Sequence, residues 1–186
     1  MFIIKNNYYL YIKNIKDINL NHIKKNKKTT IIFRNINNQV DKEELRKFRN
    51  KCKIKKIKFY ITNNIKLFNF CKADGLYLSS FNKKIYLNKN LKLIGSAHSF
   101  KEINEKIKQG CRTIFLSRLF KTSYKYKKGH FGVIKFNLIA KRYNVDIVPL
   151  GGIRNSNLNK LNIVNSKGLA LLSEVKKKPV IANRLF

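Results

Sequence analysis

The chain has 186 residues, enough for one ordinary hydrophobic core and too few for two domains of normal size. Hydrophobic residues make up 44% of it, which excludes a globally disordered protein. The formal net charge is +33, because 42 Lys and Arg residues are balanced by only 9 Asp and Glu. We expect a single globular domain over residues 1–186 with a strongly basic surface.

Two explanations compete for this charge. A basic chain can be shaped for nucleic acid or for an acidic membrane. It can also follow from A+T-rich codons, which favour Lys, Asn, Ile, Tyr and Phe. Basic clusters at residues 24–28, 51–58 and 176–178 are spread along the chain beside many Asn residues, without a separate basic tail. We attribute the charge mainly to codon composition and expect no specific nucleic-acid partner. A nucleic-acid-binding protein with aromatic residues between its lysines is the alternative.

The cysteines and the apolar segments bear on the cellular compartment. Cys52, Cys71 and Cys111 are widely spaced and form no C-x-x-C pair, which argues against a disulfide framework or a zinc site. The first residues show no basic segment followed by an apolar run, so we expect no signal peptide. No run of ~18 apolar residues occurs, so we expect no membrane-spanning helix. These features favour a cytoplasmic protein.

Short apolar runs bounded by polar residues or Gly recur along the chain. Such runs are typical of strands that are buried on both faces of a parallel sheet. The eight predicted strands are residues 8–12, 30–33, 58–61, 75–78, 91–94, 113–116, 145–150 and 168–172.

Helical patterns lie between several of these strands. Ser99 and Glu102 form a capping box at the start of the clearest helix, residues 99–109, and Asp41 with Glu44 begins another. Weaker patterns cover residues 132–143 and 157–164. Segment 81–90 is too short and too polar for a full helix, so we expect that helix to be missing or reduced to one turn.

Strands that alternate with helices form either a closed barrel or an open doubly wound sheet. No G-x-G-x-x-G follows the first strand, which removes the main signal for a dinucleotide-binding open sheet. We therefore predict an α/β fold, a compact (β/α)8 TIM barrel of parallel strands with some helices shortened. The chain is shorter than the ~250 residues typical of that fold.

Functional residues of such a barrel lie where the strands end and the following loops begin. Two adjacent glycines after the seventh strand, Gly151 and Gly152, leave backbone N–H groups open to an anion. Ser173 follows the eighth strand, and barrels often bind phosphate at these two strands. We predict a phosphate site there. Further candidates after the fifth and sixth strands are Ser96, His98, Arg118, Thr122, Lys125 and His130.

Acidic residues are too few and too badly placed for an acid–base pair or for Mg²⁺. Asp74 and Asp146 begin strands at the opposite face, and only Glu174 falls near the carboxyl ends of the strands. No Ser–His–Asp or Cys–His set emerges, and His98 can serve as a turn residue or in function. We therefore predict neither a metal nor a cofactor.

A series of short motifs runs through residues 30–186. Residues 73–78 read A-D-G-L-Y-L, 94–98 read I-G-S-A-H, 149–153 read P-L-G-G-I and 171–173 read L-L-S, while Phe120, Thr122 and Lys125 are spaced as in F-P-T-x-T-K. In order and spacing these motifs resemble those of the thiamine phosphate synthase and TenI family, which has A-D-G-V-H-L, I-G-x-S-x-H, A-I/L-G-G-I and V-V-S. Residues 32–34 and 61–63 are similar to its Q-L-R and I-N-D.

The resemblance implies a function in thiamine biosynthesis. Synthases of the family join a pyrimidine pyrophosphate to a thiazole phosphate and release pyrophosphate with Mg²⁺. It implies that Gly151, Gly152 and Ser173 hold the thiazole phosphate, and that Ser96, Lys125 and Arg34 face the pyrophosphate. We assign catalysis to Lys125, Ser96 and Arg118. We assign substrate binding to Gly151, Gly152, Ser173, Thr122, Arg34 and His98.

The chain departs from the family pattern at the metal end. The two aspartates that bind Mg²⁺ in the synthases fall at Asn63 and Asn82, and the Gln and Lys of Q-L-R-x-K fall at Ile32 and Ile36. The His of TenI-type tautomerases aligns with Arg118. We expect a transferase-like thiamine-pathway protein that binds a phosphorylated heterocycle, its basic side chains replacing the metal. The alternative is a non-catalytic or altered TenI-like binding protein, and the oligomeric state stays open.

Overall fold

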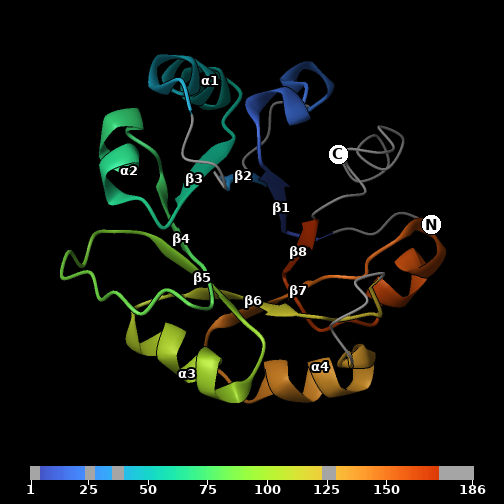
Figure 1. The fold of residues 1–186 in the computed structure, drawn as a ribbon. Helices are drawn as coiled ribbons and strands as arrows, with labels where there is room; N and C mark the ends of the chain where they lie inside the picture. Colours follow the sequence, from blue (N-terminus) through green and yellow to red (C-terminus); the bar gives the residue numbers. More distant parts are fainter. Residues whose placement is uncertain (1–4, 24–27, 35–39, 123–128, 172–186) are drawn as a thin grey trace.

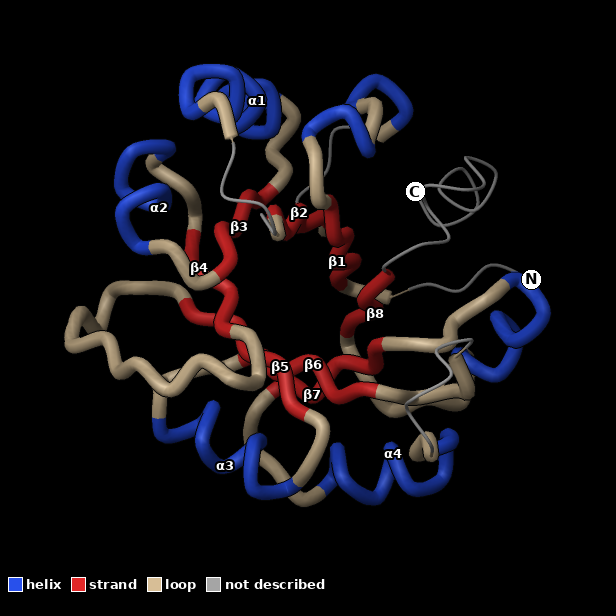
Figure 2. The backbone as a smooth tube through the Cα atoms, in the orientation of Figure 1, coloured by secondary structure: helices blue, strands red, loops and turns tan. Residues whose placement is uncertain are grey.

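The computed structural model describes residues 5–23, 28–34, 40–122 and 129–171. Eight parallel strands follow one another around a closed barrel, and β8 pairs with β1 to complete it. Helices surround the ring of strands (Figures 1 and 2). The (β/α)8 TIM barrel predicted from the sequence is confirmed. The strands are β1 (Asn7–Ile12), β2 (Thr29–Phe33), β3 (Lys58–Thr62), β4 (Gly75–Leu78), β5 (Leu93–Ala97), β6 (Thr113–Ser117), β7 (Asp146–Leu150) and β8 (Gly168–Leu171).

Of the predicted strands, β5 differs most from the structure. The other strands of the described chain agree within one residue at each end, whereas β5 was predicted at residues 91–94 and extends through Gly95 and Ser96 to Ala97. Gly and Ala are poor strand formers, so the sequence pattern ended too early. Gly95 has a packing reason to lack a side chain, since a Cβ there would lie 2.9 Å from Cγ and Cδ of Lys106.

Four α-helices and three short 3-10 helices cover the described part of the barrel. They are η1 (Ile15–Asp17), η2 (Leu20–His22), α1 (Lys42–Ile54), α2 (Ile65–Cys71), α3 (Phe100–Lys108), α4 (Gly132–Lys141) and η3 (Asn155–Leu161). α1 and α3 begin at the predicted caps, Asp41 and Ser99. α2 was not predicted, and the helix expected at 157–164 is a 3-10 helix. No helix forms between β4 and β5, in agreement with the prediction for segment 81–90.

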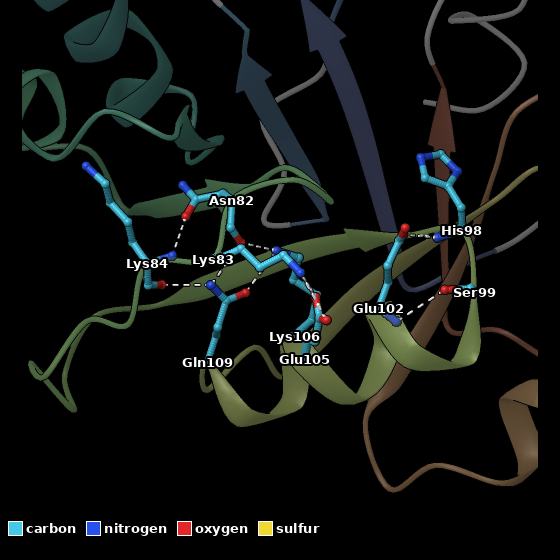
Figure 3. Close-up of polar contacts among 9 residues, drawn as sticks. All are labelled: Asn82, Lys83, Lys84, His98, Ser99, Glu102, Glu105, Lys106 and Gln109. Carbon is cyan, nitrogen blue, oxygen red and sulfur yellow. Dashed lines mark hydrogen bonds and ion pairs between the residues drawn. The ribbon is translucent and has the colours of Figure 1, made fainter.

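The expected capping box of α3 is only half formed. Ser99 Oγ accepts a hydrogen bond from the backbone N–H of Glu102 at 3.3 Å. The carboxylate of Glu102 instead accepts from the backbone N–H of His98 at 2.6 Å (Figure 3). The helix start is therefore fastened to the residue directly after β5.

The barrel interior is packed with aromatic side chains. Tyr9, Tyr11, Tyr77 and Phe115 lie inside it, and the rings of Tyr9 and Phe115 meet edge to face with centroids 4.8 Å apart. Ile32 is fully buried among them. A second apolar layer separates the strands from the helices. The centre of the barrel is thus a packed core, which leaves the strand ends for ligand binding.

Acidic residues fasten the amino ends of the strands. Asp74 accepts hydrogen bonds from Arg49 at 2.9 Å and from the backbone N–H of Phe59 at 2.7 Å. Asp146 forms an ion pair with Lys167 at 3.5 Å. Both aspartates lie at the face opposite the carboxyl ends, as predicted. Within the described residues, no helix is long and apolar enough to cross a membrane.

The three cysteines are free and buried. Loss of solvation raises the pKa of the Cys52 and Cys111 thiols to about 12, and burial also raises the pKa of Cys71. Since the thiolate is the reactive form, we expect native protein at about pH 8 to react slowly with a thiol reagent and all three cysteines to react promptly in denaturant. Mass spectrometry of the alkylated protein measures this. Prompt labelling of any one thiol in the folded protein contradicts it.

Candidate phosphate-binding cavity

A cavity of about 800 Å³ opens at the carboxyl ends of the strands. Five of the side chains that line it can carry positive charge, namely Arg34, His98, Arg118, His130 and Lys135. The lining also contains residues that carry a hydroxyl group, namely Tyr11, Tyr77, Ser79, Ser80, Ser96, Ser117 and Thr122. No Asp or Glu is present among the described residues of the lining. The cavity is therefore suited to an anion.

The structure brings most of the predicted site residues together. Ser96, His98, Arg118, Thr122, Arg34 and Gly151 all line the cavity. Gly152 follows the lining residue Gly151 in the turn after β7. Lys125 and Ser173 lie outside the described residues, as does Ile36. Residues from β2, β5, β6 and β7 thus meet at one end of the barrel, as strands of a parallel barrel require.

The glycine pair is explained by the packing of two loops. Gly151 and Gly152 have φ angles of +92° and +72°, a region that favours glycine. A Cβ on Gly151 would lie 3.1 Å from Cγ of Arg118, and a Cβ on Gly152 would collide with the backbone carbonyl of Phe120. We had expected an anion in the space beside Gly152, but the backbone of the loop after β6 fills that space. A branched side chain there would displace this loop before it reached a ligand.

Arg118 connects the loop after β6 with the start of α4. Its Nη1 donates to Thr122 Oγ1 at 3.3 Å, and its carbonyl accepts from the backbone N–H of Phe131 at 2.9 Å. This second contact brings His130 and Lys135 to the cavity wall. Lys135 was missed in the sequence because it lies within α4 and not in a loop after a strand.

The floor of the cavity is polar and neutral. Tyr77 and Ser96 both line the cavity, and the rings of Tyr11 and Tyr77 meet edge to face with centroids 5.3 Å apart. Burial raises the pKa of both phenols, so both stay protonated at neutral pH. Sequence reasoning missed these tyrosines, because an alternating side chain in an apolar strand gives no sign that its hydroxyl lies at a cavity.

Asn63 and Asn82 form a direct amide pair. Asn63 Oδ1 accepts from Asn82 Nδ2 at 2.9 Å and from the backbone N–H of Ser79 at 3.1 Å, while Asn63 Nδ2 donates to Ser79 Oγ at 2.6 Å. Asn82 Oδ1 accepts from the backbone N–H of Lys84 at 2.9 Å. Both lone pairs of Asn63 Oδ1 are thus used within the protein, and a bare amide oxygen is in any case a weak ligand for Mg²⁺.

A buried lysine holds the same loop from below (Figure 3). The fully buried Lys106 donates through Nζ to the carbonyl of Asn82 at 2.7 Å and to Gln109 Oε1 at 2.9 Å. Gln109 Nε2 donates to the carbonyls of Asn82 and Lys84 at 3.0 and 2.7 Å. Burial lowers the pKa of Lys106. An ammonium group here adds positive charge beneath the loop, so the described residues do not fit a divalent cation, and they contain no cluster of metal-binding side chains.

A serine and a histidine from neighbouring strands also meet at the cavity. Ser117, the last residue of β6, places its Oγ 2.8 Å from Nδ1 of His98, and its carbonyl oxygen is 3.2 Å from the same nitrogen. The sequence had indicated no Ser–His–Asp set, and no carboxylate of the described lining adds a third member to this pair. The two residues are 19 positions apart, and only the parallel pairing of β5 with β6 brings them together.

Comparisons with known proteins identify the family of the chain. The profile of the family described as thiamine monophosphate synthase matches residues 10–175. The chain belongs to this family. It is 31% identical over 108 residues to a thiamine-phosphate synthase of Prochlorococcus marinus, which covers 55% of this chain and 31% of that protein. A thiamine-phosphate synthase of Dictyoglomus turgidum is 23% identical over 128 residues, 65% of this chain and 57% of that protein. The chain thus spans about a third to a little over half the length of these relatives.

Solved structures of the thiamine monophosphate synthase family share the fold. Thiamine phosphate pyrophosphorylase from Pyrococcus furiosus has a TM-score of 0.77 at 17% identity, over 97% of this chain and 93% of that one. The corresponding protein from Bacteroides thetaiotaomicron has a TM-score of 0.62 at 15% identity, over 93% and 85% of the two chains. At such identities the likeness concerns the fold alone.

The amide pair leads to a stability prediction. Asn63 has a φ of +54°, which Asn tolerates better than Ala, and its side chain makes three hydrogen bonds. We expect Asn63→Ala to lower the free energy of unfolding by about 1–3 kcal/mol. Asn69→Ala, on the exposed face of α2, serves as the control and should change it little. Urea denaturation measures both variants, and equal stability of the two would contradict the role of the pair.

Proposed function

We propose that this chain binds a phosphorylated thiazole of the thiamine pathway in the cavity and acts as a transferase of the thiamine phosphate synthase type. The observation that carries the proposal is the lining itself, in which Arg34, Arg118 and Lys135 stand beside two histidines without an acidic residue among the described ones. A charge-assisted hydrogen bond from such groups to phosphate is stronger than a neutral one. The family and the position at the strand ends support the same ligand class.

Two anionic subsites follow from this proposal. The thiazole phosphate would be held at the ends of β7 and β8 by the backbone N–H group of Gly151, which lines the cavity, and by Ser173. The pyrophosphate of a pyrimidine substrate would face Ser96, Arg34 and Lys125, with Thr122 and His98 at its side. The neutral floor formed by Tyr77 and Ser96 would receive the heterocycle. The guanidinium group of Arg118 can pair with two phosphoryl oxygens at once, which suits it to the space between the subsites.

The proposed reaction does not use Mg²⁺ at Asn63 and Asn82. Mg²⁺ normally requires carboxylates, and the oxygens of this amide pair are already hydrogen-bonded to protein groups. Arg118 and Lys125 would neutralise the charge of the pyrophosphate. A second candidate, a TenI-like binding protein without turnover, is favoured by the same loss of carboxylates. Incubation with both thiamine precursors, followed by chromatography of the products, separates the two.

A phosphate site makes ligand affinity depend on the phosphoryl group. We expect the protein to bind a thiazole phosphate at least about tenfold more tightly than the unphosphorylated thiazole alcohol, a difference of about 1.4 kcal/mol. Arg118→Met should reduce this ratio because a guanidinium group at the cavity is lost. Arg112→Met, an exposed arginine before the amino end of the same strand, should leave it unchanged. Isothermal titration calorimetry measures the affinities. Equal affinity of the unchanged protein for both compounds would remove the phosphate site.

Metal independence is tested by restoring the two carboxylates. We expect the unchanged protein to show no binding of Mg²⁺ alone, and the double variant Asn63→Asp, Asn82→Asp to acquire it, because two carboxylates at one site attract a hard cation. Calorimetry with MgCl₂ measures both proteins, with circular dichroism to verify the fold. Equally tight Mg²⁺ binding by the unchanged protein and the double variant, or turnover that strictly needs Mg²⁺, would overturn this part of the proposal.

A further inference from the structure

The contacts of the His98 ring determine which of its nitrogens carries the proton. Nδ1 lies 3.2 Å from the backbone carbonyl oxygen of Ser117 and 2.8 Å from its hydroxyl. A carbonyl oxygen can only accept a hydrogen bond, so the nitrogen that faces it must donate. The hydroxyl can adapt, since it donates or accepts by rotation. Nδ1 of the neutral ring is therefore the N–H, and Nε2 carries the lone pair.

The permanently charged side chains of the cavity wall cannot accept a hydrogen bond, whereas its hydroxyl groups and His130 can. Arg34, Arg118 and Lys135 can only donate hydrogen bonds, and no carboxylate is present among the described lining residues. The carboxylate of Glu102 accepts from the backbone N–H of His98 at 2.6 Å and not from its ring. The imidazole of His98 is thus a hydrogen-bond acceptor held in a fixed orientation. The charged side chains around it can only donate hydrogen bonds.

We propose that His98 Nε2 accepts a hydrogen bond from the P–OH group of a monoprotonated phosphoryl group that is bound in the cavity, which for inorganic phosphate is the dianion HPO₄²⁻. The cationic side chains bind the ionised phosphoryl oxygens, and His98 binds the oxygen that retains its proton. Ser117 is a positioning residue, because it fixes the ring through Nδ1. This inference rests on the proposed phosphate site and adds which form of phosphate the site selects.

The relative binding of phosphate and sulfate distinguishes whether His98 accepts or donates a hydrogen bond. At mildly alkaline pH both are dianions of nearly the same shape, but HPO₄²⁻ has one O–H donor and SO₄²⁻ has none. We expect calorimetry to show a preference for phosphate over sulfate of about tenfold or more, the effect of one hydrogen bond that involves a charged group. His98→Phe should remove the preference while sulfate still binds. His22→Phe, an exposed histidine on η2, should retain it.

Ser117 gives a second, independent readout. Nitrogen-15 NMR of the imidazoles should show Nδ1–H and an unprotonated Nε2 for His98. Ser117→Ala should weaken the preference for phosphate and mix the two tautomers, whereas Ser117→Thr should retain both properties.

Each remaining outcome overturns a different statement. Equal binding of phosphate and sulfate by the unchanged protein, or an Nε2–H tautomer, overturns the role of His98 and leaves the phosphate site intact. Failure to bind either anion overturns the phosphate site and this inference with it.

Discussion

The pairing of β8 with β1 is the contact on which the arrangement of the cavity depends. Tyr8 lies opposite Leu169 and Leu10 opposite Leu171, so the sheet closes with every strand running in the same direction. Closure places the carboxyl ends of all strands at one rim. Arg34 after β2 and Arg118 after β6 are far apart in the sequence and on different sides of the ring, yet both line one cavity. An open sheet of the same strands would not bring them to a common ligand.

Polar contacts hold the rim of the barrel together between β4 and β5, where no helix forms. Between β4 and β5 the backbone is held by Asn63, Asn82, Lys106 and Gln109, mainly through hydrogen bonds to carbonyl groups. Amide side chains suit this task because each can donate and accept at once. Two carboxylates at the positions of Asn63 and Asn82 would repel each other unless a cation lay between them. The amide pair and the absence of a helix between β4 and β5 therefore fit one structural solution.

Most of the fold could be predicted from the sequence because buried parallel strands leave a strong local pattern. β5 was mispredicted because Gly95 is required by a side chain on α3, and such long-range packing has no local signal. The rule that functional residues lie at strand ends singled out Ser96, His98 and Arg118, and the structure places all three at the cavity. It could not find Tyr77, whose hydroxyl reaches the floor from within a strand, or Ser117, whose importance depends on its contact with His98 across two strands. Gly152 was singled out in the sequence as part of an anion site. In the structure, a glycine is required there because a side chain would collide with the backbone of Phe120.

The overall charge and the charge at the cavity have different consequences. A net charge of +33 attracts any polyanion, but exposed charges are screened by salt within a Debye length of about 8–10 Å. In the cavity a few basic groups converge on a concave surface beside neutral, partly buried hydroxyl groups, where water competes less and interactions are stronger. Nonspecific binding should therefore be much more sensitive to salt than binding of a small phosphorylated ligand. Codon composition can account for the surface charge, whereas the position of Arg118 against Gly151, and of His98 against Ser117, depends on the fold.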